Sequence, residues 1–341
     1  MKTYRTGFSL LAGFVCSICI LTATPARALP GDLDPGLGGF GVGGRIQDAG
    51  FDVFAVTLDL QGRLLVAGRR DGTFHLQRRS GPRFLTVEDA GTIILGIQTS
   101  AVANAVAVAP DGKIVLAGYV GYDFDYDIAV ARFNDDLSPD ETFAGDSTAN
   151  VDFDDDFDGA NAVAIQDDLK IVVVGSADIT SVIVGDADWA AVRFNENGTL
   201  DSSFNDDGKW SFDADHENDR AHAVAIQDDG KILIAGSIGP DQFFDNQDFA
   251  VVRLNANGSY DNSFGGDGRV DVAFGGEEGA LGVAIDPVNG SVVLAGGGFS
   301  GYAPVSEDIK VARLLSNGGV DNSFDGDGKL ILPIDGGTAT A

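Results

Sequence analysis

The chain has 341 residues, of which 52 are acidic and 22 basic, and its formal net charge is -30. A protein this acidic does not follow a nucleic-acid backbone, which needs clustered Lys and Arg, and anionic membrane surfaces repel it. The 47 glycines argue against a helical protein, because glycine in a helix interior costs about 1 kcal/mol relative to alanine. The 44% of hydrophobic residues argue against an acidic disordered chain. The composition therefore predicts an acidic β protein punctuated by glycine.

Residues 1–28 have the pattern of a secretory signal peptide. Lys2 and Arg5 precede an apolar stretch over about 8–21, and Ala26-Arg27-Ala28 forms an A-x-A cleavage site. The apolar stretch is too short for an ordinary transmembrane helix, although an uncleaved anchor is the alternative. Cleavage would remove both cysteines and deepen the net charge to -33. We expect an exported protein (extracellular, periplasmic or at the cell surface), without disulfides and without a transmembrane segment in the mature chain.

Four kinds of segment recur in fixed order. Examples are "NAVAV" at 104–108, "KIVLAG" at 113–118, "DIAVARF" at 127–133 and, after a Gly-Lys or Gly-Arg, "GKWSF" at 208–212. The arginines near the end of the third segments lie 61, 60 and 60 residues apart: Arg132, Arg193, Arg253 and Arg313. Self-similarity at a fixed period of about 60 residues indicates a repeat architecture.

The repeated segments have the character of β-strands. They are short, rich in Val, Ile and Phe, and bounded by Gly, Asn or Asp. Asn-Gly and Asp-Gly pairs between them suit tight turns. The second segments are almost entirely apolar, so they need cover on both faces. Four antiparallel strands per repeat with both faces buried predict a β-propeller, as one all-β domain over 29–341 with five four-stranded blades. A β-solenoid is the rival fold.

The two ends of the chain carry partial copies of the repeat. Residues 33–46 resemble 320–332, and the fourth segment occurs about six times against five copies of the others. We expect a terminal copy to complete a blade begun at the other end and to close the ring, which abolishes exposed sheet edges. Six blades are the alternative. Residues 79–97 lack the Asn-Gly turn and the D-x-S-F of later repeats, so the first repeat is degenerate.

The stretch 248–285 closely resembles the delta-60 repeat of bacterial β-propeller proteins, and 188–212 and 308–332 resemble it nearly as well. The resemblance covers almost all of the chain after residue 28. It implies a propeller on an exported protein, and it implies no known activity, ligand or catalytic residue.

Aspartates recur at two fixed places in the repeat. Those of one set lie five residues before the third-segment arginine: Asp127, Asp188, Asp248 and Asp308. Those of the other lie three residues before a phenylalanine: Asp140, Asp201, Asp261 and Asp321. Residues that are present in successive blades are expected to hold the blades together. We interpret both sets and the arginines as partners in ion-paired or hydrogen-bonded networks.

The connections that vary between repeats are the candidate binding surface. Turns alternate between the two ends of an antiparallel blade, so the second-to-third and fourth-to-first connections share one end. Variable loops on a rigid repeat commonly carry binding. The aromatic candidates in the second-to-third loops are Tyr122, Phe124, Tyr126, Phe243, Phe244, Phe299 and Tyr302. The expected ligand is a protein or a polysaccharide; the alternative is that these rings pack under their own loops.

One acidic loop resembles half of a calcium-binding loop. Asp154, Asp156 and Asp158 alternate before Gly159, which is the D-x-D-x-D-G pattern of carboxylate ligands and a sharp turn. Ile165 stands where the pattern needs a glutamate. A Ca²⁺ site at these three aspartates is the candidate metal site, with "DFDYD" at 123–127 as a weaker acidic cluster, and no other cofactor is expected.

Sequence signals for catalysis are weak. The histidines are His75, His216 and His222, and no G-x-S-x-G, H-E-x-x-H or phosphate-binding glycine loop occurs. We therefore expect a monomeric, non-catalytic binding or scaffolding module. The alternatives are a carbohydrate-active hydrolase with paired carboxylates in the propeller funnel and a calcium-stabilised surface adhesin.

Overall fold

The computed structural model describes residues 51–80, 86–93, 100–122, 125–153, 157–177, 187–213, 219–239, 247–276, 278–298 and 308–333. Every regular element in these ranges is a β-strand. They form five antiparallel sheets of four strands each, in which neighbours in sequence are neighbours in the sheet. The all-β prediction and the four strands per repeat are confirmed. The same ranges contain no helix long and apolar enough to cross a membrane.

The sheets are numbered here in chain order. Sheet 1 consists of β1 (Asp52–Leu58), β2 (Leu64–Arg70), β3 (Thr73–Ser80) and β4 (Thr86–Ile93). Sheet 2 consists of β5 (Ser100–Val108), β6 (Ile114–Tyr122), β7 (Asp125–Phe133) and β8 (Thr148–Val151). Sheet 3 consists of β9 (Gly159–Ile165), β10 (Ile171–Ala177), β11 (Asp188–Phe194) and β12 (Lys209–Phe212). Sheet 4 consists of β13 (Arg220–Ile226), β14 (Ile232–Ile238), β15 (Asp248–Leu254) and β16 (Arg269–Val272). Sheet 5 consists of β17 (Glu278–Ile285), β18 (Val292–Gly298), β19 (Ile309–Leu314) and β20 (Lys329–Leu332).

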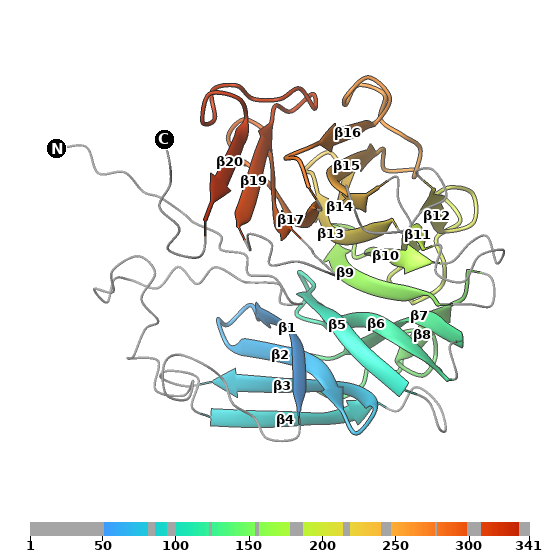
Figure 1. Ribbon diagram of the computed structural model, residues 1–341. Helices are drawn as coiled ribbons and strands as arrows, with labels where there is room; N and C mark the ends of the chain where they lie inside the picture. Colours follow the sequence, from blue (N-terminus) through green and yellow to red (C-terminus); the bar gives the residue numbers. More distant parts are fainter. Residues whose placement is uncertain are drawn as a thin grey trace.

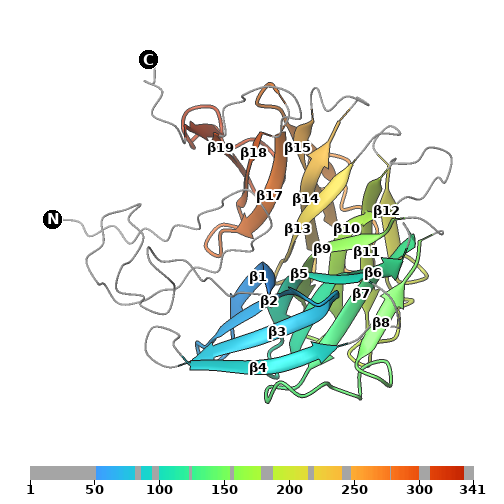
Figure 2. The same ribbon diagram turned by 60° about the horizontal axis from the view of Figure 1, so that its bottom comes forward.

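The sheets follow one another in an arc, from the blue sheet 1 to the orange and red sheet 5 (Figures 1 and 2). The first strands of neighbouring sheets lie against one another. A hydrophobic cluster fills each of the four junctions between consecutive sheets. Val115 and Ile128 of sheet 2, for example, belong to one cluster with Val173 and Val192 of sheet 3. The second strands of sheets 2 to 4 are buried on both faces, which explains their almost continuous apolar sequence.

The two ends of the arc do not meet in the described part of the chain. No hydrophobic cluster joins sheet 5 to sheet 1 among these residues. Each sheet uses four consecutive strands, so the expected exchange of a terminal strand is not seen in them. Residues 33–46, which were expected to take part in it, lie outside the described residues. Sheet 1 does have a fourth strand, because β4 pairs with β3 although its sequence departs from the repeat.

The first strand of every sheet carries a β-bulge at the same place in the repeat. The bulged residues are Phe54, Asn104, Asn161, His222 and Leu281. Two of them connect neighbouring sheets. The Asn104 amide donates to the carbonyl of Ala160, and the Asn161 amide donates to that of Ala221, each at 2.9 Å. The bulges therefore place polar side chains where they bridge the innermost strands.

Candidate functional site

An arginine, an aspartate and a phenylalanine form a repeated latch at one end of the sheets. In sheet 3, the Nε of Arg193 donates to Oδ2 of Asp201 at 2.7 Å, and its guanidinium lies 4.8 Å from the centroid of the Phe204 ring. Its Nη1 donates to the carbonyl of Ala256 in sheet 4. Arg132, Arg253 and Arg313 repeat the aspartate and ring contacts. The expectation that these residues are structural partners is confirmed for the arginines and for the second set of aspartates.

The latch aspartates are held ionised. Burial raises the pKa of Asp201, but hydrogen bonds from Ser203 and the charges of Arg193 and Lys170 outweigh burial, so the net pKa is lowered. The hydroxyl and the N–H of Ser203 both donate to Oδ1 of Asp201. In Asp140 and Asp261, hydrogen bonds and nearby cations likewise outweigh burial, so the pKa of each carboxyl is lowered. These carboxylates are therefore committed to binding their own arginines and serine or threonine neighbours.

The first set of aspartates lies at the other end of the third strands and does not contact the latch arginines. Asp127 lies near the start of β7, opposite Val120 and five residues before Arg132. Burial raises the pKa of Asp127, and the nearby Asp152 and Asp125 raise it further. Burial and Glu278 likewise raise the pKa of Asp248. This end of the sheets therefore holds an excess of partly buried negative charge.

Three aromatic rings gather at that acidic end, on sheets 2 and 3. The ring centroids of Tyr119 and Tyr126 are 5.3 Å apart, and those of Tyr126 and Phe157 are 5.2 Å apart. The main chain supports the cluster, because Asp158 donates its N–H to the carbonyl of Tyr126 at 2.7 Å. The loop after β6 and the residues before β9 thus lie together, as the alternation of turns predicts. We call Tyr119, Tyr126 and Phe157 the aromatic cluster.

The aromatic cluster is partly open to solvent. Phe157 is 45% exposed, and Tyr122, at the end of β6, is 68% exposed. Tyr126 was a predicted binding residue, whereas Phe157 was not. Phe157 lies inside the acidic loop that was assigned to calcium, which hid its contribution to an aromatic surface. The remaining predicted aromatic residues lie outside the described residues: Phe124, Phe243, Phe244, Phe299 and Tyr302.

Asp158 is the one predicted calcium ligand among the described residues, since Asp154 and Asp156 lie outside them. It is fully buried, and its Oδ2 accepts the N–H of Phe153 at 2.5 Å. Carboxylates recur at this position: Asp219 accepts the N–H of Gly239, and Glu278 accepts that of Phe274. Asp158, just before β9, therefore holds the backbone of Phe153, just after β8, by a hydrogen bond. Within the described ranges, no group of three or more His, Cys, Asp or Glu side chains is arranged to hold a metal ion.

Comparison with known proteins supports the repeat. Residues 109–143, 166–204, 227–264 and 289–324 match a family model described as "Domain of unknown function (DUF5122) beta-propeller". Each match begins at the turn after the first strand of a sheet and ends at the latch phenylalanine. These four segments are therefore β-propeller repeats, and they belong to sheets 2 to 5. The degenerate first repeat is not part of the match.

Solved structures resemble the chain in fold. A protein of unknown function from Dyadobacter fermentans is 12% identical with a TM-score of 0.51, and 86% of each chain is covered. One of unknown function from Bacteroides caccae is 14% identical with a TM-score of 0.42, covering 84% of this chain and 88% of that one. Virginiamycin B lyase from Staphylococcus aureus is 9% identical with a TM-score of 0.45, covering 85% and 73%. No curated protein matches the chain.

Proposed function

We propose that the chain is an exported, non-catalytic β-propeller of the delta-60 type that binds a protein or a polysaccharide at the acidic, aromatic end of its sheets. The observation that carries the proposal is the aromatic cluster, together with the 68% exposed Tyr122 at the end of β6. Aromatic rings with one polar tip are common contact residues in protein interfaces. The latch at the opposite end recurs from sheet to sheet, whereas the residues around the aromatic cluster are particular to sheets 2 and 3.

The partly buried carboxylates at the same end of the sheets as the aromatic cluster favour a ligand rich in hydroxyl or N–H donors. Asp127 follows Tyr126 on β7, so its side chain lies on the other face of sheet 2. Its raised pKa reflects burial and two neighbouring carboxylates. A ligand that donates hydrogen bonds there relieves this repulsion, and the rings supply the apolar contact. Polysaccharides and protein loops both offer this combination. Export is supported by the signal-peptide pattern of residues 1–28.

A glycan and secreted-protein array tests this function. Purified protein is compared with a Tyr122→Ala/Phe157→Ala variant and with Leu60→Ala, which removes a 60% exposed apolar side chain from a turn at the opposite end of sheet 1. We expect at least one ligand whose affinity falls about tenfold or more in the aromatic variant and stays unchanged in Leu60→Ala, in line with truncation of an interface anchor. An array without any such ligand contradicts the proposal.

We also propose that the arc closes into a five-bladed ring, with sheet 5 packed on sheet 1. Val293 and Val311 of sheet 5 are only partly buried, whereas their equivalents in sheet 2, Val115 and Val130, are fully buried against sheet 3. Such an apolar sheet face in water is unfavourable.

The latch of sheet 5 supports the same closure. Arg78, Arg132, Arg193 and Arg253 each donate Nη1 to a carbonyl of the following sheet. Arg313 makes no such bond among the described residues, and its side chain is 31% exposed. A neighbouring sheet would supply the missing carbonyl.

A further inference from the structure

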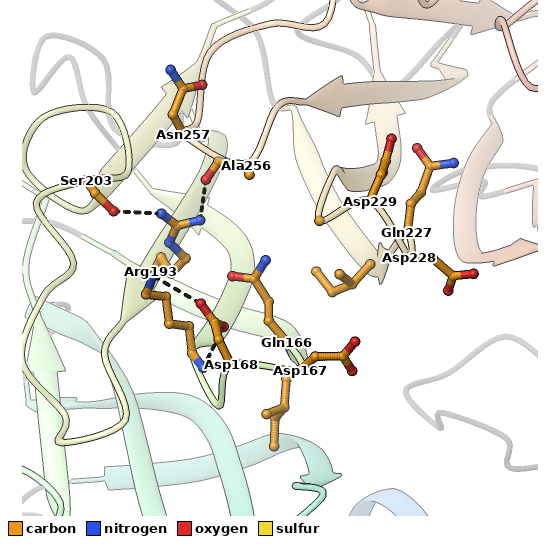
Figure 3. A pocket seen from close by; sticks show the side chains of 14 residues that line it. Gln166, Asp167, Asp168, Arg193, Ser203, Gln227, Asp228, Asp229, Ala256 and Asn257 are labelled. Carbon is orange, nitrogen blue, oxygen red and sulfur yellow. Dashed lines mark hydrogen bonds and ion pairs between the residues drawn. The ribbon is translucent and has the colours of Figure 1, made fainter.

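A groove of about 640 Å³ lies between sheets 3 and 4, at the latch end and thus opposite to the aromatic cluster. The turns that follow β9 and β13 form its walls, and both carry paired aspartates (Figure 3). These are Asp167, Asp168, Asp228 and Asp229. Carboxylates alone do not define a binding site in a chain with 52 acidic residues, so the inference rests on the other groups in the groove.

One glutamine side chain in the groove presents an oxygen atom that accepts no hydrogen bond from the described residues. Gln166 is only 7% exposed, and its Oε1 is buried. Gln166 opens the turn after β9, and Figure 3 shows its carboxamide projecting between Arg193 and the turn that carries Asp229. The equivalent Gln227 opens the turn after β13, and its carboxamide points away from Gln166 (Figure 3). A buried acceptor without a donor is unfavourable, so a ligand that brings an N–H group to Gln166 would be stabilised here.

Sheet 1 shows which group satisfies an acceptor at this position of the repeat. Asp59 opens the equivalent turn, and its Oδ2 accepts the Nε of Arg63 at 2.5 Å. The Nη2 of Arg63 then donates to Oε1 of Gln61 at 2.8 Å and reaches Asp135 of sheet 2, whose Oδ1 lies 2.9 Å away. A guanidinium group therefore bridges the turn of sheet 1 to the next sheet.

The junction between sheets 3 and 4 lacks both parts of that bridge. Lys170 stands at the position of Arg63, and Ala256 stands at the position of Asp135. The Nζ of Lys170 lies 3.1 Å from Oδ2 of Asp168 in its own turn, so it does not span the groove. Arg193 does not fill it either, because its guanidinium is engaged by Asp201, Ser203 and the carbonyl of Ala256.

We propose that this groove binds the guanidinium group of an arginine side chain from a partner protein. The fork of N–H donors in a guanidinium group suits the Gln166 acceptor together with the aspartates of both turns. The negative charge of the whole chain attracts such a group from a distance. The partner arginine takes the place that Arg63 occupies between sheets 1 and 2, and the site is separate from the aromatic cluster.

A hexa-arginine peptide, followed by fluorescence anisotropy with the purified protein, tests the site. The decisive variant is Lys170→Arg/Ala256→Asp, which rebuilds the internal bridge of sheet 1 inside the groove. It makes the protein more negative by one charge, so unspecific attraction predicts tighter binding, whereas our proposal predicts binding at least about tenfold weaker. Binding that is unchanged or tighter overturns the proposal.

Three further comparisons separate the site from its surroundings. Gln166→Leu and Asp229→Asn should each weaken binding about fivefold or more, while Asp111→Asn should change it less than twofold. Asp111 is the matched control because it holds the place of Asp229 in sheet 2, and each Oδ1 accepts the N–H two residues later. Hexa-citrulline, which lacks the charge, should not bind. Equal losses in Asp229→Asn and Asp111→Asn, or equal affinity for hexa-lysine, overturn the guanidinium site.

Discussion

Gly236 of β14 and Arg220 of β13 approach so closely that a Cβ on the glycine would lie 1.9 Å from the arginine's carbonyl oxygen. The bulge at His222 causes this approach, because the extra residue moves the first strand over its neighbour. The equivalent glycines in the second strands of the other sheets have the same relationship: Gly68, Gly118, Gly175 and Gly296. The repeated glycine and the repeated bulge are therefore one structural feature.

Gly236→Ala should lower the free energy of unfolding by about 3 kcal/mol or more, because the methyl group would overlap backbone rather than a movable side chain. Urea denaturation measures this change in the free energy of unfolding. Gly159→Ala is the matched control, since a Cβ there would lie 3.4 Å from the Phe157 ring, at ordinary contact distance. The control substitution should lower the free energy of unfolding by less than about 1 kcal/mol. Equal costs would show that the approach to Arg220 does not explain the glycine.

Two leucines occupy turn positions where other sheets have glycine, and they should respond in opposite directions. Leu169 (φ 64°) replaces the glycine found at Gly112 and Gly230, and Leu137 (φ 68°) replaces the one at Gly198. A non-glycine residue in this region costs about 1–2 kcal/mol. Leu137 belongs to a hydrophobic cluster, whereas Leu169 does not belong to any described cluster.

Leu169→Gly should therefore raise the melting temperature, and Leu137→Gly should lower it because the loss of a buried leucine outweighs the relief of strain. Differential scanning calorimetry of both variants measures the effect. A lower melting temperature for Leu169→Gly would contradict the strain argument.

Repetition made most of the fold predictable from sequence. The period of 60 residues, the apolar second segments and the turn glycines indicate stacked four-stranded sheets, and the latch arginines follow from their fixed spacing. The aromatic cluster was only partly predictable, because Phe157 joins it through a contact between loops that lie about 30 residues apart in the sequence. The groove between sheets 3 and 4 was not foreseen. It depends on Lys170 and Ala256, which have neither the guanidinium group of Arg63 nor the carboxylate of Asp135 at the equivalent positions.

The latch should be a large contributor to stability. Arg193→Ala leaves the buried Asp201 with only the more distant Lys170, whose Nζ lies 3.6 Å from Oδ2, and should lower the free energy of unfolding by about 3 kcal/mol. Arg69→Ala is the control, because Arg69 and Asp52 form an exposed pair with side chains 41% and 57% accessible. Exposed pairs contribute about 0–1 kcal/mol. Chemical denaturation distinguishes the two, and similar losses would argue against a role for burial.

His222 should make the protein sensitive to mild acid. Burial lowers its pKa from 6.5 to about 4, with a contribution from Arg220. Between these pH values the unfolded chain binds a proton that the folded chain excludes. The free energy of unfolding therefore falls as the pH decreases through this window, by roughly 2 kcal/mol, and this histidine adds no further loss below it.

His222→Asn, which gives sheet 4 the residue of sheets 2 and 3, should remove that part of the acid loss. Urea denaturation at pH 7 and pH 4.5 is compared between the two proteins, so that contributions from other groups cancel. An identical loss of unfolding free energy between pH 7 and pH 4.5 in the two proteins would show that His222 does not titrate in this way.

We propose that the five sheets form one ring with an aromatic end and a latch end, and a distance measurement between spin labels shows whether this ring is closed. Labels at Gln61 and Val288, on the exposed turns of sheets 1 and 5, are compared with labels at Asp111 and Asp168, on the same turns of the neighbouring sheets 2 and 3. A closed five-bladed ring predicts the same distance distribution for both pairs. A clearly longer distance between Gln61 and Val288 would contradict the closed ring.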